Sequence, residues 1–297
     1  WIDLDDEIVG AEKIAGELEY MVKNNLDVIW FRYDYIPRET LSDPESLSWR
    51  ERIVKNAPNL EWRDVAVHET LDESIQGEIN EELRSEIIIK HRKTLDGFLK
   101  SNDRNQRILE KDWAAAPTAV TGYYLGRTLA GLGEYEDAID KLVFAAEKSE
   151  IIPVQFESWL NLCDCYFALT KYDKALDAAN KAMTIDPDHP MPWFKKFMVY
   201  QAQGMHTAAM HCAEMSLEKP VEGGRGLVLT VDLSWYQYKA PFEIARAYLA
   251  MGKNDRAYDL YKKVKDRAPQ YIEELGTKMN ISWDDMFEVA YNNIHEQ

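Results

Sequence analysis

Over the C-terminal two-thirds of the chain, apolar residues recur three and four positions apart. This spacing places them along one side of an α-helix, and it repeats from one segment to the next. The clearest segment carries Trp159, Leu162 and Tyr166 on one helix, and Ala175 and Ala179 on the following helix. Large residues on the first helix would fill the space opposite small residues on the second. The pattern therefore predicts pairs of antiparallel helices packed in series.

The small residues of the second helices return at a regular interval. They are Ala138, Ala175, Ala209 and Ala257, with spacings of 37, 34 and 48 residues. This interval resembles that of the tetratricopeptide repeat, whose period is about 34 residues. We therefore expect a tetratricopeptide-like α-solenoid of four repeats within residues 101–297. The longest spacing leaves room for a glycine-containing loop at 221–233, and helical patterns at 271–278 and 283–294 would cap the stack.

Residues 1–100 follow a different pattern, in which helical and strand-like segments alternate. The strand candidates, rich in β-branched and aromatic residues, are 27–35, 49–54 and 60–67. The helix candidates, in which apolar residues return at helical spacing, are 6–25 and 79–100. The predicted fold is mostly α, with an α/β segment over residues 1–100 followed by the helical repeats over residues 101–297.

Composition narrows the classes of function. The chain has 35 Lys and Arg residues against 52 Asp and Glu residues, and the resulting net charge of −17 opposes binding to the phosphates of nucleic acid. No apolar run has the length of a membrane span. Three cysteines without a framework spacing indicate a reducing compartment, so we predict a cytoplasmic protein. Solubility explains the net negative charge, and an acidic groove for a basic partner is the alternative explanation.

The chain opens on an acidic run that contains two carboxylates in a D-x-D spacing, Asp3 and Asp5. Such carboxylates at the end of a strand can hold a divalent cation that bridges the two phosphates of a nucleotide sugar. Acidic residues at this place would also favour the N-terminus of a following helix. The motif by itself leaves both interpretations open.

The order of motifs along the chain resembles that of family-2 glycosyltransferases. The D-x-D run is followed by an aromatic strand, an arginine strand, a run that ends in Val-His-Glu, and an Arg-Asn pair before the repeats. The matching segments are 1–7, 30–33, 49–53, 62–69 and 104–105. The resemblance implies the C-terminal portion of an A-type nucleotide-sugar fold, fused to tetratricopeptide repeats.

The resemblance implies a metal-dependent, inverting enzyme that moves a sugar from a nucleotide-sugar donor to a protein, peptide or glycan acceptor. It places Asp3, Asp5 and His68 at a Mn²⁺ or Mg²⁺ ion that binds the donor diphosphate, with Asp5 as the expected direct ligand. For His68, a structural role with satisfied hydrogen bonds is the alternative.

The same resemblance implies which residues act on the substrates. Glu69 or Asp64 would be the general base that takes the proton of the acceptor hydroxyl. Arg50 and Arg52 would pair with the diphosphate, since the guanidinium fork suits phosphate oxygens. Ion pairs on a solvated strand face are the alternative for both arginines. In this family the nucleotide-binding strands precede the D-x-D strand, so we expect that half to be missing from the present chain, which would then be inactive alone.

In tetratricopeptide arrays, the first helices of successive repeats line a concave surface where a partner binds. The predicted partner-binding side chains on these helices are Asn161, Asp164, Lys195, Tyr200, Glu243 and Arg246. A second hypothesis for the whole chain requires no catalysis. It is a non-catalytic tetratricopeptide scaffold that mediates protein–protein interaction or assembly, including homo-oligomerisation through the repeats.

Overall fold

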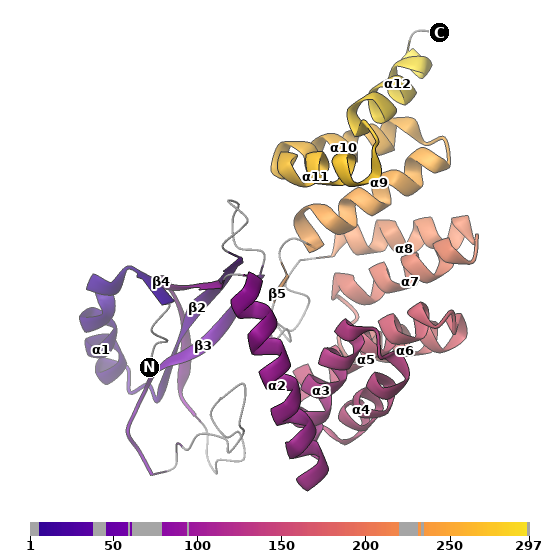
Figure 1. The fold of residues 1–297 in the computed structure, drawn as a ribbon. Coiled ribbons are helices and arrows are strands. Elements are labelled where there is room, and N and C mark those ends of the chain that lie inside the picture. Colours follow the sequence, from indigo (N-terminus) through magenta and orange to yellow (C-terminus); the bar gives the residue numbers. More distant parts are fainter. Residues whose placement is uncertain are drawn as a thin grey trace. The chain divides into compact units, whose positions relative to one another are not determined.

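A computed structural model of the 297-residue chain describes residues 6–37, 46–58, 60, 79–93, 95–219, 231–232 and 235–295 (Figure 1). The chain divides into two compact units. The first comprises Trp1–Leu169 with Leu227–Val231, and the second comprises Thr170–Gly226 with Asp232–Gln297. The first unit holds a β-sheet and the first helical hairpins, and the second holds the later hairpins.

The sheet has five strands in the order β1-β4-β2-β3-β5. Their bounds are β1 Asp6–Val9, β2 Val28–Pro37, β3 Ser46–Val54, β4 Glu81–Lys93 and β5 Val231–Asp232. Strand β2 pairs antiparallel with β3 and parallel with β4, while β1 pairs antiparallel with β4. The strands predicted at 27–35 and 49–54 are confirmed by β2 and β3. The third predicted strand lies, apart from residue 60, outside the described residues.

One helix packs against this sheet. A 3₁₀ turn, Ala11–Lys13, leads into helix α1, Ile14–Lys23. Met21 of α1 packs with Ile29 of β2 and Ile89 of β4 in a buried apolar cluster. The helix predicted within residues 6–25 is thus confirmed over α1. Its first four residues instead form β1, the strand that pairs with β4.

The helix predicted at residues 79–100 is wrong over most of its length, because residues 81–93 form strand β4. Ile79, Leu83 and Ile87 are four positions apart, and a spacing of four fits one face of a helix as well as one side of a strand. The run of isoleucines at 87–89 decides for the strand, because β-branched side chains are restricted in helices and pack well in sheets. Neighbours on both sides, β1 and β2, satisfy its backbone groups.

Helix α2, Leu95–Ala115, follows β4, so residue 100 lies inside a helix. The predicted division of the chain between residues 100 and 101 stays a prediction. Three helices continue the first unit: α3 Ala119–Leu132, α4 Tyr135–Lys148 and α5 Ile152–Ala168. Figure 1 shows α3 and α4 as an antiparallel hairpin with α5 beside it.

The α3–α4 hairpin depends on one glycine. A Cβ built on Gly126 would lie 2.6 Å from Leu142 Cγ and 3.1 Å from the Ala138 carbonyl oxygen. Leu142 is fully buried, so it has little freedom to move away. Only glycine at residue 126 lets the two helix backbones approach this closely. At this contact the small residue lies on the first helix and the large residue on the second, which is the reverse of the arrangement predicted for the repeats.

The described part of the second unit contains further helices and one π-helical turn, η2. The bounds are α6 Tyr172–Ile185, α7 Pro190–Ala202, α8 His206–Glu218, η2 Trp235–Lys239, α9 Ala240–Ala250, α10 Asn254–Arg267, α11 Pro269–Met279 and α12 Trp283–His295. The two helices predicted after the last repeat are confirmed by α11 and α12. Most of the loop predicted at 221–233 lies outside the described residues, and at its end residues 231–232 form β5.

The second unit has a continuous apolar core. Small residues of the second helices, such as Ala209, Ala213 and Ala257, are fully buried. They pack in one cluster with large residues of the first helices, including Phe197 and Phe242. The alternation of small and large side chains predicted from the sequence therefore builds the core that holds α7–α12 together.

Candidate functional site

Five of the residues implied by the glycosyltransferase resemblance lie outside the described residues. They are Asp3, Asp5, Asp64, His68 and Glu69. Within the described ranges, no group of three or more His, Cys, Asp or Glu side chains is placed to hold a metal ion. The Mn²⁺ or Mg²⁺ site predicted from the sequence therefore stays a prediction.

The other two residues from that resemblance, Arg50 and Arg52, lie on β3. The pairing of β2 with β3 passes from Ile29 opposite Ile53 to Trp30 opposite Glu51, so Arg52 is the extra residue of a β-bulge. Its guanidinium carbon lies 5.1 Å from the centre of the Tyr33 ring, and its Nη1 donates to the Glu51 carbonyl oxygen at 3.0 Å. The bulge thus places the Arg52 guanidinium over the ring of Tyr33. Diphosphate binding by either arginine stays a prediction.

A buried polar cluster on the same sheet was missed by the sequence reasoning. Asp6 Oδ1 lies 2.8 Å from His91 Nδ1 and accepts a hydrogen bond from the Tyr33 hydroxyl at 3.2 Å. The rings of Tyr33 and His91 stack with their centres 5.5 Å apart. Asp6 and His91 are 85 residues apart and meet because β1 and β4 pair in that register. The cluster fastens the short edge strand β1 to the sheet.

Two of the predicted partner-binding residues lie on α5 in the first unit. Asp164 is exposed, and Asn161 is half-buried with its Nδ2 donating to the Glu157 carbonyl oxygen at 2.7 Å. On the same helix, Cys163 and Cys165 are buried thiols, as Cys212 is on α8.

The other four predicted residues lie on α7 and α9 in the second unit. Lys195 Nζ lies 5.9 Å from the centre of the Trp235 ring. Arg246 Nη1 donates to both carboxylate oxygens of Glu243 at 2.9 Å, and its guanidinium carbon lies 5.3 Å from the Trp283 ring. These residues are half-buried, so each presents part of its side chain to solvent.

The fourth residue, Tyr200, is placed differently. It follows Lys195 by five positions, which is a rotation of roughly 140° around a helix. Its side chain packs against the apolar core of the second unit. Tyr200 therefore contributes to the support of α7 more than to the face that carries Lys195.

Two residues of this region were not found from the sequence, Trp235 and Lys239. Both belong to η2. Lys239 Nζ lies 6.0 Å from the centre of the Trp235 ring, and Lys195 Nζ approaches the same ring. Lys239, Glu243 and Arg246 recur at intervals of four and three, which aligns them along α9 and its extension. We call Lys195, Trp235, Lys239, Glu243 and Arg246 the charged-aromatic face.

The π-helical geometry places Trp235 in this face. The ring of Phe194, a buried residue of α7, lies 5.5 Å from the Trp235 ring and supports it. Turns of π-helix are rare and occur often at functional sites. The available sequence signal was the run Trp235–Lys239, which holds three aromatic residues directly before α9.

The N-terminus of α7 holds a buried histidine. The Nδ1 atom of His189 accepts a hydrogen bond from the Met191 backbone N–H at 3.2 Å, which caps the helix. Burial lowers the pKa of the His189 imidazole to about 4, against an opposing effect of Asp186. The side chain is therefore neutral at physiological pH, as the cap requires.

This histidine predicts a pH dependence of stability. Between pH 6.5 and pH 4 the unfolded chain binds a proton at His189 that the folded chain does not, so stability falls as the pH is lowered through that window. The full loss attributable to this group is about 3 kcal/mol. The variant His189→Asn keeps a capping acceptor but does not titrate. Urea unfolding at pH 7 and pH 4.5 should show a smaller pH effect in the variant, and an equal effect would contradict the assignment.

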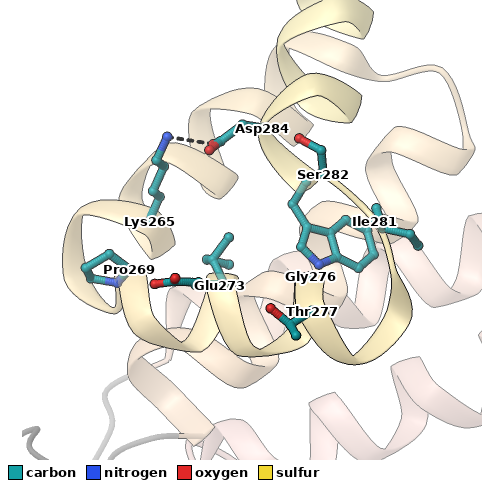
Figure 2. A pocket seen from close by; sticks show the side chains of 10 residues that line it. Lys265, Pro269, Glu273, Gly276, Thr277, Ile281, Ser282 and Asp284 are labelled. Atoms are coloured by element: carbon teal, nitrogen blue, oxygen red, sulfur yellow. Dashed lines mark hydrogen bonds and ion pairs between the residues drawn. The ribbon is translucent and has the colours of Figure 1, made fainter.

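A pocket of about 400 Å³ lies between α10, α11 and α12 (Figure 2). Asp284 on its wall accepts hydrogen bonds from Lys265 Nζ and the Tyr261 hydroxyl, both at 2.6 Å. These two donors hold the pKa of the Asp284 carboxyl below its ordinary value. Asp284 and Lys265 therefore form a fixed, neutralised pair at one side of the pocket.

Comparison with known proteins identifies the repeats. Family models of the tetratricopeptide repeat match residues 123–190 and 242–271. A TPR repeat-containing protein of Methanocaldococcus jannaschii is 25% identical over 182 residues, which are 54% of this chain. The chain spans only 30% of the length of that relative. The chain therefore carries tetratricopeptide repeats, as the interval of its small residues predicted.

The solved structures that match part of this chain include MamA and two proteins described as TPR proteins. A MamA crystal structure has a TM-score of 0.45 at 20% identity and covers 59% of this chain and 94% of its own. A thermophilic TPR protein of Thermus thermophilus, TTC0263, has a TM-score of 0.44 at 20% identity, covering 58% and 86%. YrrB, described as a TPR protein with an unusual peptide-binding site, has a TM-score of 0.43 at 14% identity, covering 64% and 84%. Similarity at this level carries no functional assignment.

The predicted enzyme activity is wrong. The curated relative is described by its TPR repeats, and both matching family models are tetratricopeptide repeats rather than glycosyltransferases. The predicted nucleotide-sugar donor has no support from these matches. Among the described residues, no helix is long and apolar enough to cross a membrane.

Proposed function

We propose that this chain is a protein-interaction scaffold that binds a peptide segment of a partner protein on the charged-aromatic face. The observation that carries the proposal is the position of Lys195 and Lys239 at the ring of Trp235, at 5.9 and 6.0 Å. The tetratricopeptide match over residues 242–271 supports it, since such repeats present continuous surfaces to partners.

The chemistry of the face favours a partner that carries a carboxylate. Lys195 and Lys239 place two positive charges beside one indole ring, in a chain whose net charge is −17. A partner side chain with an acidic head and an apolar stem could pair with the ammonium groups and contact the ring. Tryptophan is also common among residues that carry much of the binding energy at protein interfaces.

The face is held in place before any partner binds. Trp235 packs on Phe194, and Glu243 fixes Arg246 through two hydrogen bonds. Arg246 in turn lies over the ring of Trp283, which is 4% exposed. A surface with fixed side chains loses less conformational entropy on binding than a mobile one. Asn161 and Asp164 on α5 are proposed as further contacts in the first unit.

A display experiment tests the proposal. Phage that display random dodecamer peptides would be selected for binding to the full chain. The selected peptides would be labelled with a fluorophore, and their binding to the chain would be measured by fluorescence anisotropy. We expect the double variant Lys195→Glu/Lys239→Glu to weaken binding at least about tenfold, which corresponds to about 1.4 kcal/mol. The charge change is large and lies at the proposed contact, so the effect should exceed that of remote charges.

The matched control is Lys262→Glu/Lys263→Glu, which makes the same charge change at two exposed residues of α10. This control should bind the selected peptides nearly as the unmodified chain does. Circular dichroism would confirm that both double variants remain folded. Equal weakening in the two variants, or none in the first, would contradict the proposal.

A further inference from the structure

The pocket between α10, α11 and α12 is a second candidate site, separate from the charged-aromatic face. Its wall is partly apolar, through Ile272, Ile281 and the ring of Trp283, and partly polar, through Glu273 and the Lys265–Asp284 pair (Figure 2). A volume of about 400 Å³ is within the range of small-ligand pockets and would hold one amino-acid residue with its flanking peptide groups.

One buried donor on this wall has no acceptor. Trp283 is 4% exposed, and its indole Nε1 has no hydrogen-bond partner within the part of the chain that the structure describes. An indole nitrogen can only donate, and leaving such a buried group without an acceptor costs free energy. A ligand that brings a carbonyl oxygen to this N–H would recover that cost.

A glycine leaves the space beside this donor. A Cβ built on Gly276, which also lines the pocket, would lie 3.9 Å from Trp283 Nε1 and 3.5 Å from Trp283 Cδ1. Any side chain at residue 276 would therefore stand against the N–H edge of the indole. The same Cβ would lie 2.8 Å from the Ile281 carbonyl oxygen, so glycine also permits the tight turn between α11 and α12.

The charges around the pocket indicate which kind of ligand it would bind. Lys265 and Asp284 neutralise each other at 2.6 Å, whereas Glu273 is exposed and has no cationic partner among the described residues. Over the three helices that line the pocket, residues 254–295 contain eight Asp and Glu residues against six Lys and Arg residues, so the local excess of negative charge is two. The pocket therefore attracts a cation, and its aliphatic and indole surfaces suit the stem of a long basic side chain.

We propose that this pocket binds a peptide segment at an arginine or lysine residue. A peptide carbonyl oxygen accepts a hydrogen bond from the Trp283 indole N–H. The aliphatic stem of the arginine or lysine side chain lies on the apolar wall, and its cationic head pairs with the Glu273 carboxylate. The pocket shares no lining residue with the charged-aromatic face, but Arg246 of that face lies over the ring of Trp283.

Nuclear magnetic resonance of the full ¹⁵N-labelled chain tests this directly. The indole N–H signal of Trp283 would be assigned as the one that disappears in Trp283→Phe. The probe is the blocked tripeptide acetyl-Ala-Arg-Ala-amide, which has no terminal charges. We expect it to move the Trp283 indole signal in a saturable way at millimolar concentrations, as a new hydrogen bond forms at that proton.

Two matched controls test whether binding depends on the positive charge of the arginine side chain. The same tripeptide with citrulline in place of arginine keeps the shape and loses the charge, and it should bind about tenfold more weakly. The variant Glu273→Gln should weaken the arginine peptide by a similar factor without changing the fold, because Glu273 is exposed. The double variant Lys195→Glu/Lys239→Glu should bind the tripeptide normally, which separates this site from the proposed function.

The outcomes decide the proposal. No movement of the Trp283 indole signal with the arginine peptide would overturn it. Equal binding of the arginine and citrulline peptides would overturn the pairing with Glu273, and so would unchanged affinity in Glu273→Gln.

Discussion

Replacing Phe242 with alanine is expected to lower the free energy of unfolding of the second unit by about 3–5 kcal/mol. Phe242 is fully buried on α9, and its ring contacts aromatic rings of other helices. The ring centres lie at 5.1 Å for Trp283, 5.8 Å for Tyr271 and 6.3 Å for Phe287. Alanine would leave a cavity that these large rings cannot fill without leaving their own contacts.

Urea unfolding followed by circular dichroism measures this loss. The control is Val289→Ala on α12, whose side chain is 57% exposed and which should change stability by less than about 0.5 kcal/mol. Hydrogen exchange of the folded variant would show whether α9–α12 are the helices that open. If Phe242→Ala unfolds at the same urea concentration as the unmodified chain, the core described for the second unit is wrong.

Replacing Arg84 with alanine should destabilise the first unit by about 3 kcal/mol. The Arg84 guanidinium donates to both carboxylate oxygens of Glu17 at 2.8 and 3.2 Å, and it lies 4.3 Å from the Tyr20 ring. The Glu17 side chain is 5% exposed, so the substitution leaves a carboxylate buried without its cation. Removing one member of a buried pair is therefore expected to cost far more than removing both.

A double variant checks this explanation. The variant Glu17→Met/Arg84→Met replaces both charges with apolar side chains of similar length, and it should lose less stability than Arg84→Ala. The surface pair of Lys13 and Glu86 is the control, because its side chains are 47% and 59% exposed. Lys13→Ala should change stability by less than about 1 kcal/mol. A double variant as unstable as Arg84→Ala would show that packing, and not the unpaired charge, causes the loss.

The helical repeats could be predicted from the sequence because their packing imposes a period on it. Ala138, Ala175, Ala209 and Ala257 must be small wherever two helices approach closely, and all four are fully buried. The sheet left a weaker signal. The apolar residues of β4 are four positions apart, which also fits a helix, so the spacing alone predicts the wrong element. The β-branched run at 87–89 and the pairing with β1 and β2 favour the strand.

The candidate site was predicted in part. Helical phase alone placed Lys195, Glu243 and Arg246 on the first helices of the repeats. It could not place Trp235 and Lys239, because η2 departs from the α-helical period before α9 begins.

Two features depend on tertiary contacts. One is the contact between Asp6 and His91, and the other is the Trp283 indole N–H, which has no acceptor among the described residues. Residues 85 positions apart on two strands share no local pattern that sequence reading could detect. Whether a buried donor finds an acceptor depends on every element packed around it. Such features become visible only in the folded chain.

Photo-cross-linking shows whether a partner peptide lies on the charged-aromatic face. A benzophenone amino acid would replace Trp235 in η2, or Lys262 on the exposed side of α10 as the control. Each full-length variant would be irradiated with the same library-selected peptide. We predict a cross-link from position 235 that unlabelled peptide abolishes, and none from position 262. A competed cross-link from position 262 alone would contradict the claim.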